Sequence, residues 1–362
     1  MSGRSTCLAA VFATLLLPPT RASAQQVTTP FERLPAQVFD ATPPAARVTG
    51  VPGSMALRPG TCRSLPIADA RRRIVELAVQ EWGFFGFPVV EYNDDDEGPG
   101  PGGARTGGPG AGTNGQGGGR GRGRSRIGTP EAARTAASIG GYWAVTPGGG
   151  WILENQNEYW REAISGVTRW RFPWSAAFIS WLMCEGGIGT PEQFQRAIAH
   201  HTYIDQAIRA NDSASSRTAY IARDVGEAPV APGDMLCTSR QPVFRTIADR
   251  RRQMGQGART HCDVVVKVDA AAGHILAIGG NVRGVVGLKI LPAARVRGVL
   301  QPALPASARQ VFAHLSLRSQ ATAPDAFDNS PTLAALACVV GPTTARWAAA
   351  RQLAPAVVRC GD

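Results

Sequence analysis

The sequence predicts an α+β fold in which a group of helices precedes a small antiparallel sheet. Between residues 68 and 210, apolar residues recur at helical spacing in several segments. Between residues 235 and 291, short runs rich in valine and isoleucine alternate with turn residues, as in antiparallel strands. Because the helices come first and the strands follow, this order is typical of α+β rather than of alternating α/β folds.

The individual elements follow from local patterns. Residues 68–82 are expected to form a helix, because Ile74, Leu77 and Trp82 recur on one face and Gly83 follows. Further helices are expected over residues 130–139, 176–184, 191–199 and 203–210, and strands over residues 235–238, 261–268, 274–278 and 285–291.

The chain begins with a segment that reads as a secretory signal. Arg4 supplies the positive charge, residues 8–17 form an apolar run too short to span a bilayer, and Ala22-Ser23-Ala24 fits a cleavage site. We expect residues 1–24 to be removed; the alternative is an uncleaved anchor. The protein is then periplasmic or extracellular, with no transmembrane segment after signal removal.

Composition divides the rest of the chain. Residues 25–60 are rich in Pro, Ala and Thr and are interpreted as a disordered lead-in to one domain over residues 61–315. Residues 94–128 carry an acidic cluster and then a Gly-rich tract, which we interpret as a disordered insertion in that domain. Residues 316–362 form an Ala/Pro-rich tail with one expected helix around residues 331–340.

The cysteines indicate disulfide bonds. Six remain after signal removal, and an even number in an oxidising compartment favours pairing. We expect Cys237–Cys262 and Cys338–Cys360 first, because each pair joins segments expected to be close. The alternative is a metal site built from Cys237, His261 and Cys262, but no paired C-x-x-C spacing supports it. No metal or organic cofactor is implied.

The formal net charge of +11 allows several partners. A basic exported protein is attracted to anionic wall polymers, lipid head groups or nucleic acid, although a solvated basic surface explains the charge equally well. The Arg-Gly run over residues 117–126 is open to the same two interpretations. No basic motif interleaved with aromatic residues is present, so no specific nucleic-acid partner is expected. The oligomeric state does not follow from the sequence.

One set of residues predicts chemistry. The turn between the expected strands 261–268 and 274–278 centres near residue 271, so His261 and Asn281 should face each other in an antiparallel hairpin. Ser175 begins a helix that could pack at the same sheet edge. The order Ser175, His261, Asn281 is that of a nucleophile, a base and a residue that orients the base.

These residues also carry a family resemblance. Residues 173–181, Pro-Trp-Ser-Ala-Ala-Phe-Ile-Ser-Trp, resemble the Trp-Cys-Ala-Ala-Phe-Val-x-Trp signature of NlpC- and CHAP-type amidases and endopeptidases. Pro232-Gly233-Asp234, the segment 260–265 and the segment 278–281 are similar to that superfamily's Pro-Gly-Asp, Gly-His-Val-Gly-Ile-Val and Gly-Gly-Asn segments. The chain resembles more closely the bacterial domain of unknown function 2272, which shares the serine, His200 to Tyr203 and Cys237. The resemblance covers about residues 64–295.

The resemblance implies a papain-like fold with Ser175 in the position of the thiol nucleophile, His261 as base and Asn281 as orienting residue. A hydroxyl is not ionised by a helix N-terminus as a thiol is, so Ser175 would need His261 to remove its proton. Ser175 is equally well explained as a helix N-cap, and Asn281 as a left-handed turn residue. His261 alone could be a packed core residue.

Other residues are candidates for a supporting role. Trp174 precedes the nucleophile, and Asp234 is expected to cap or brace a turn. His200 and Tyr203 either line the cleft or cap a helix at the surface, and we favour the surface cap. Alternation along the strand points Cys262 away from His261, which favours a disulfide or core role. Four tryptophans, at positions 143, 151, 160 and 170, either form a glycan-stacking surface or belong to the core.

Two functions remain open. The chain is either an amidase or peptidase acting on cell-wall peptides through Ser175, His261 and Asn281, or a catalytically silent module that binds cell-wall peptide or glycan in the same cleft.

Overall fold

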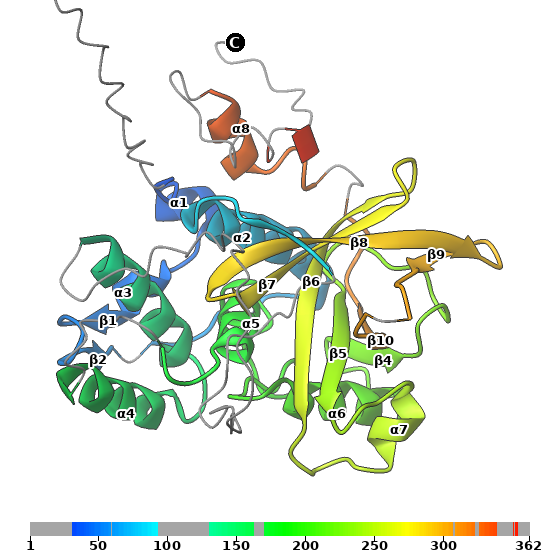
Figure 1. Cartoon of the computed structure of the whole chain (residues 1–362), viewed down its shortest axis with the longest axis horizontal. Helices are drawn as coiled ribbons and strands as arrows, with labels where there is room; N and C mark the ends of the chain where they lie inside the picture. Colours follow the sequence, from blue (N-terminus) through cyan, green and yellow to red (C-terminus); the bar gives the residue numbers. More distant parts are fainter. Residues whose placement is uncertain are drawn as a thin grey trace, which may run out of the picture.

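The computed structural model describes residues 31–58, 60–92, 130–162, 170–306, 308–322, 326–338, 350 and 352–353. The signal segment and the Gly-rich insertion therefore lie outside the described residues. Within them the fold is a mixed α+β arrangement of eight α-helices and an eight-stranded sheet, as the order of patterns predicted (Figure 1).

The sheet is antiparallel except at one edge. Seven strands follow the order β3-β8-β7-β6-β5-β10-β4, and β9 pairs with β8; only the β3–β8 pair is parallel. Their bounds are β3 Val89–Glu91, β4 Tyr220–Arg223, β5 Met235–Gln241, β6 Arg259–Asp269, β7 His274–Val282, β8 Val285–Val296, β9 Val299–Pro302 and β10 Val311–Leu317.

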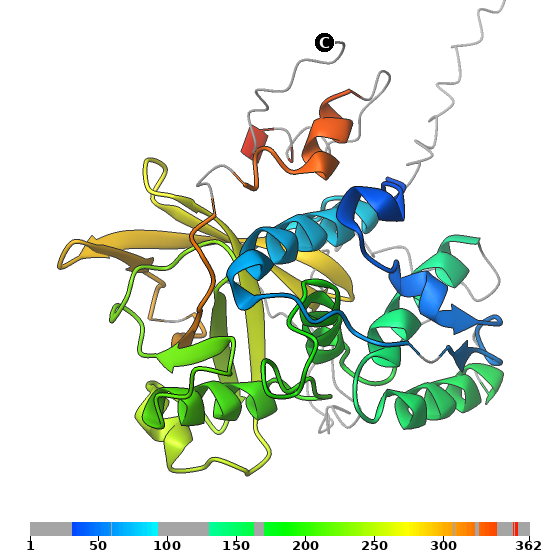
Figure 2. The same ribbon diagram turned by 180° about the vertical axis from the view of Figure 1, so that it is seen from behind.

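The helices pack mainly on one face of this sheet. In Figure 2, which shows the molecule from behind, the helix α2 crosses in front of the long strands, and α3 and α4 lie to its right. Helices α2 and α5 contact strands of the sheet, α6 contacts β4 and β6, and α3 packs on α5. The helices are α1 Ala36–Phe39, α2 Ala70–Phe84, α3 Pro130–Ala144, α4 Gly149–Glu162, α5 Ser175–Glu185, α6 His200–Asp212, α7 Ile247–Arg251 and α8 Pro331–Ala337.

Helix α5 lies at the centre of the core. All of its residues are buried, as expected for a helix that is apolar on every side. It approaches β7 closely at Gly280, where an added Cβ would lie 2.5 Å from the Cβ of Phe178. The small residue at this point lets the start of α5 sit directly against the sheet.

The interpretation of residues 25–60 as a disordered lead-in is wrong for residues 31–58. Phe31 and Phe39 are buried in the main core, and the strands β1 (Val48–Thr49) and β2 (Ala56–Leu57) pair with each other. Arg33 reaches the buried carboxylate of Glu81 on α2 at 2.6 and 2.7 Å. The apolar residues of this Pro-rich segment are widely spaced and show no regular period, although Phe31, Phe39 and Met55 are buried in the core.

Two further expectations need correction. Residues 191–199 form turns and irregular backbone rather than a helix, and His200 begins the helix that follows. The domain does not end at residue 315, because β10 continues to Leu317 in the middle of the sheet. The expected helix near residue 331 is confirmed as α8, which packs on α2 and carries the buried residues Leu333 and Leu336.

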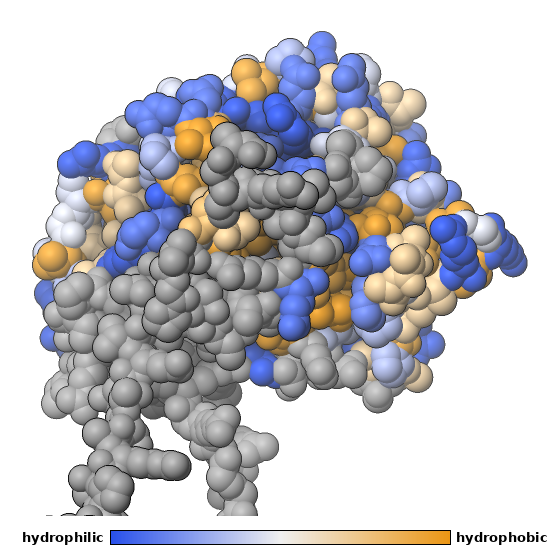
Figure 3. All heavy atoms as spheres, turned by 90° about the horizontal axis from the view of Figure 1, so that it is seen from above, coloured by the Kyte–Doolittle hydropathy of each residue, from blue (hydrophilic) through white to orange (hydrophobic). Residues whose placement is uncertain are grey.

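The surface of the described residues is mixed. In Figure 3 hydrophilic and hydrophobic residues are interspersed on the face shown. None of the helices in the described ranges combines the length and the apolar character that crossing a membrane requires.

Candidate active site

The structure brings Ser175 together with His200. Ser175 is the first residue of α5 and His200 is the first residue of α6, so two helix starts meet at this point. The Ser175 Oγ lies 2.7 Å from His200 Nε2, and both residues are only 3 % exposed. Ser175 is not the N-cap of α5: Trp174 holds that position, and no side chain caps the helix.

The contacts of His200 determine which tautomer its neutral ring has in the resting structure. The backbone N–H of Cys262 donates to His200 Nδ1 at 3.2 Å, and the Tyr203 hydroxyl also contacts Nδ1. A backbone N–H can only donate, so Nδ1 carries a lone pair and the ring proton of neutral His200 sits on Nε2. In this resting arrangement His200 donates to the Ser175 oxygen.

Burial keeps His200 neutral. Removal from water lowers the pKa of His200 well below its usual value, and the neighbouring His261 lowers it further. The charge of Asp263 acts in the opposite direction and favours the imidazolium. An uncharged His200 is therefore the form present near pH 7.

A second polar cluster lies beside the first. On β6, His261 and Asp263 are two residues apart and so share one face of the strand. His261 Nε2 lies 2.8 Å from one Asp263 oxygen, and Lys289 Nζ on β8 lies 2.8 Å from the other. Burial alone would raise the pKa of the Asp263 carboxyl, but the contacts with His261 and with the ammonium of Lys289 hold it far below its usual range.

This second cluster leaves one nitrogen without a partner. When the His261 ring is neutral, its Nε2 contact with the Asp263 carboxylate leaves the lone pair on Nδ1, and this buried atom has no hydrogen-bond partner among the described residues. The ring of His261 lies 5.1 Å from that of His200, measured between centroids. A histidine oriented by a carboxylate with a free lone pair is the arrangement of a general base.

The predicted set of Ser175, His261 and Asn281 is only partly assembled. The hairpin register near His261 is as predicted, since Val264, three residues after His261, pairs with Ile278, three residues before Asn281. However, Asn281 has a left-handed φ of 57° and makes no side-chain hydrogen bond within the described ranges. Asp263 takes the place expected for Asn281, and His200 takes the place beside Ser175 expected for His261.

The comparisons with known proteins identify the family. The sequence model described as "Uncharacterized protein conserved in bacteria (DUF2272)" matches residues 136–322, which is just over half of the chain. The chain belongs to this family. No curated protein and no solved structure matches the chain. The likeness to NlpC- and CHAP-type enzymes, and with it the papain-like fold, therefore receives no support from these comparisons.

The region matched by the DUF2272 family contains both polar clusters. It also contains Asp234, whose carboxylate accepts hydrogen bonds from Arg71, from the backbone of Leu317 and from His314 at 2.8 Å. Asp234 therefore braces its turn against α2 and β10, as expected, and does not contact Ser175. Trp174 is buried and its ring stacks between those of Phe85 and Tyr142.

From the sequence we expected His200 to cap a helix at the surface, and this prediction is wrong. His200 is buried, and Ala199 holds the N-cap position of α6. Tyr203 is buried with it, and burial raises the pKa of its hydroxyl well above the usual value. The four tryptophans considered as a glycan-stacking surface differ in burial. Three of them are buried, namely Trp143, Trp160 and Trp170, whereas Trp151 is 55 % exposed.

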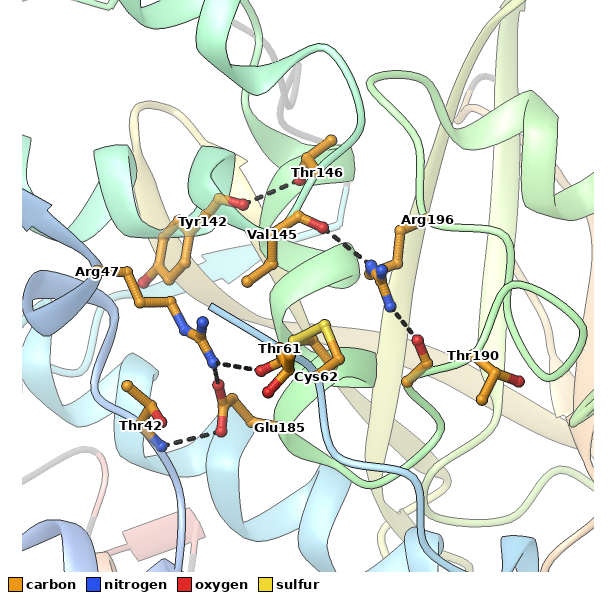
Figure 4. Close-up of a disulfide and its surroundings, with 12 residues drawn as sticks. Thr42, Arg47, Thr61, Cys62, Tyr142, Val145, Thr146, Glu185, Thr190 and Arg196 are labelled. Carbon is orange, nitrogen blue, oxygen red and sulfur yellow. Dashed lines mark hydrogen bonds and ion pairs between the residues drawn. A yellow bond between two sulfur atoms is a disulfide. The ribbon is translucent and has the colours of Figure 1, made fainter. Parts of the chain in front are cut away.

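Two disulfides are formed within the described residues of this DUF2272 protein. Cys237–Cys262 joins directly paired residues of β5 and β6, which confirms the prediction and excludes the alternative metal site, because neither sulfur is a free thiolate. Cys62–Cys184, at the end of α5, was not predicted (Figure 4). The expected Cys338–Cys360 pair involves Cys360, which lies outside the described residues. Two disulfides indicate an oxidising, extracytoplasmic location.

Sequence reasoning missed Asp263 and Lys289 as members of the site. A signal for both was present: Asp263 is an acidic residue two positions after a histidine in an otherwise apolar strand, and Lys289 is one of only two lysines in the chain and lies in a valine-rich strand. Charged residues in a strand buried on both faces are expected to pair with each other.

Proposed function

We propose that this DUF2272 protein is an exported, papain-like hydrolase that cleaves amide bonds of cell-wall peptides, with Ser175 as nucleophile. The observation that carries the proposal is the 2.7 Å contact between Ser175 Oγ and His200 Nε2 at the start of a buried helix. His200 replaces His261 as the residue that receives the serine proton. The substrate class rests on the motif resemblance and on the extracytoplasmic location indicated by the disulfides.

The start of α5 supports acyl transfer. The first helical hydrogen bond runs from Phe178 N–H to the Trp174 carbonyl, so the preceding N–H groups of the helix have no acceptor within it. Such groups, at the positive end of a helix, stabilise the oxyanion that forms when a hydroxyl attacks a carbonyl.

The proton transfer needs the second tautomer of His200. With the proton on Nδ1 donated to the Tyr203 oxygen, Nε2 accepts the Ser175 proton while Oγ bonds to the substrate carbonyl carbon. The imidazolium then gives that proton to the departing amine, and water attacks the acyl-serine in a second step that returns the proton. The nearby Asp263 carboxylate stabilises the imidazolium during both steps.

A second candidate function, a catalytically silent wall-binding module, is favoured by two specific observations. The Cys262 amide holds His200 in the tautomer that donates to Ser175 rather than accepting from it. In addition, Ser175, His200 and His261 are each only 3 % exposed. Both observations fit a polar core that stabilises the fold without turning over a substrate.

Purified protein incubated with peptidoglycan separates the two functions, with release of new amino groups as the measurement. If the protein is a hydrolase, Ser175→Ala should lower the rate of amino-group release at least about a hundredfold. The matched control is Ser180→Ala, because Ser180 is buried on the same helix but donates to the Ala197 carbonyl instead. It should keep the wild-type rate.

Two results would decide for the binding module. One is an inert wild type that becomes active as Ser175→Cys. The other is co-sedimentation with insoluble peptidoglycan that is equal for wild type and Ser175→Ala, with no amino groups released by either. Nitrogen-15 NMR of the His200 ring adds a direct readout, since a proton that stays on Nε2 when substrate is bound contradicts the hydrolytic step.

A further inference from the structure

A pocket of about 370 Å³ lies beside the start of α6, and neither Ser175 nor His200 is among its lining residues. Its walls are mostly apolar and come from the α3–α4 connection and the irregular residues 191–198, with Thr202 from α6. The lining residues used below are Pro147, Pro191, Phe194, Arg196, Ile198 and Thr202. A volume in the range of about 300–1,000 Å³ with apolar walls and a few polar groups is typical of small-molecule sites.

Arg196 is the charged residue of this pocket. Its Nε donates to the Val145 carbonyl at 2.9 Å, and its Nη1 donates to the Gly189 carbonyl. Figure 4 shows the guanidinium held between these two segments, which continue into Pro147 and Pro191 of the pocket walls. A guanidinium has five N–H groups, so these two contacts leave further donors available.

The charge of Arg196 has no partner of opposite charge in the part of the chain that the structure describes. No carboxylate pairs with Arg196 among the described residues, whereas the nearby Arg47 is paired with Glu185 on the other side of the Cys62–Cys184 disulfide (Figure 4). Burial lowers the pKa of Arg196, and the charge of Arg47 lowers it further. A bound anion would offset both effects.

We propose that this pocket binds a small carboxylic acid, with the carboxylate on Arg196 and the apolar part against Phe194 and Ile198. A guanidinium presented by a rigid fork matches a carboxylate in geometry and charge, and the apolar walls accept a short aliphatic group. This site does not depend on catalysis at Ser175.

The test uses the full chain and two probes, N-acetylalanine and its uncharged amide N-acetylalaninamide, in calorimetric titrations. The acid should bind at least tenfold more tightly than the amide. Arg196→Gln should remove that difference. Ile198→Glu places a negative charge at the pocket edge and should weaken binding of the acid at least tenfold. Val243→Glu is the matched control, because Val243 is also exposed, at 69 %, but does not line the pocket.

Three outcomes would overturn the site: equal affinity for acid and amide, no binding of either probe at millimolar concentration, or unchanged binding of the acid by Ile198→Glu. Because Arg196 joins two segments, its variant is also checked for folding by circular dichroism. If Arg196→Gln does not fold, the Ile198→Glu and Val243→Glu pair decides alone, since both side chains are exposed in the wild type.

Discussion

Gly279→Ala tests whether the buried His261–Asp263 contact exists as described. Gly279 lies on β7, facing the carboxylate of Asp263 on the neighbouring strand. A Cβ added at Gly279 would be 1.9 Å from Asp263 Oδ1 and 3.1 Å from His261 Nε2. The first distance is far below any real contact, so the carboxylate must move away from the histidine.

The size of the effect follows from what the carboxylate loses. A hydrogen bond to a charged group contributes about 1.5–3 kcal/mol, and a buried charge that loses its partner costs about 3–5 kcal/mol. Lys289 keeps its contact with the second oxygen, which places the expected loss of unfolding free energy at about 3 kcal/mol. Gly257→Ala is the matched control: an added Cβ there meets nothing within 4 Å and the residue does not have a left-handed φ, so the change should stay within about 0.5 kcal/mol.

Urea unfolding followed by tryptophan fluorescence measures both variants. The penalty of Gly279→Ala should shrink strongly in an Asp263→Ala background, because the colliding oxygen is then absent. The reasoning is refuted if the full penalty persists in that background, or if Gly279→Ala is no more destabilising than Gly257→Ala.

Three other predictions concern stability. Replacing Cys62 and Cys184 with alanine should lower the unfolding free energy by about 5 kcal/mol, because that disulfide closes a loop of 122 residues. Replacing Cys237 and Cys262 should lower it by about 3.5 kcal/mol, because that loop has 25 residues. The reverse order in urea unfolding would contradict the chain-entropy argument. The pKa of His200 is lowered in the folded protein, so on acidification the unfolded chain takes up this proton first. The unfolding free energy should therefore fall by up to about 1.4 kcal/mol per pH unit below about pH 6.5. His200→Gln should reduce this slope, and equal slopes for wild type and variant from pH 7 to 5.5 would rule the linkage out. Arg47→Met breaks a buried pair with Glu185 and should cost about 3–5 kcal/mol, whereas Arg63→Met breaks an exposed pair with Asp40 and should cost less than about 1 kcal/mol in the same assay.

Helices and strands with a regular spacing of apolar residues could be predicted from the sequence. The helix over residues 68–82 corresponds to α2 at Ala70–Phe84, and the valine-rich strand after Thr260 corresponds to β6. The hairpin register was also predictable near its open end, because Val264 and Ile278 are equally far from residue 271. The number of residues between each strand position and the turn can be counted in the sequence, so the strand register can be predicted without a structure.

Contacts between distant segments were not predictable in this way. Strand β10 enters the sheet between β5 and β4, more than 70 residues along the chain from β5. His200 reaches Ser175 because the irregular residues 191–199 bring the start of α6 next to that of α5, and an irregular segment has no periodic pattern from which this could be predicted. The predicted partner His261 lies in the adjacent cluster, so the sequence located the region of the site but not the pairing within it.

The course of the chain before residue 93 affects how this family is best expressed. The segment matched by the family begins at residue 136, yet α2 inserts Ile74, Leu77 and Trp82 into the core that the matched segment forms. A recombinant fragment trimmed to residues 136–322 would leave that apolar surface bare and would also lack Cys62, leaving Cys184 as an unpaired thiol. Such a fragment should aggregate, whereas one that starts at Phe31 retains both the covering helix and the covalent link.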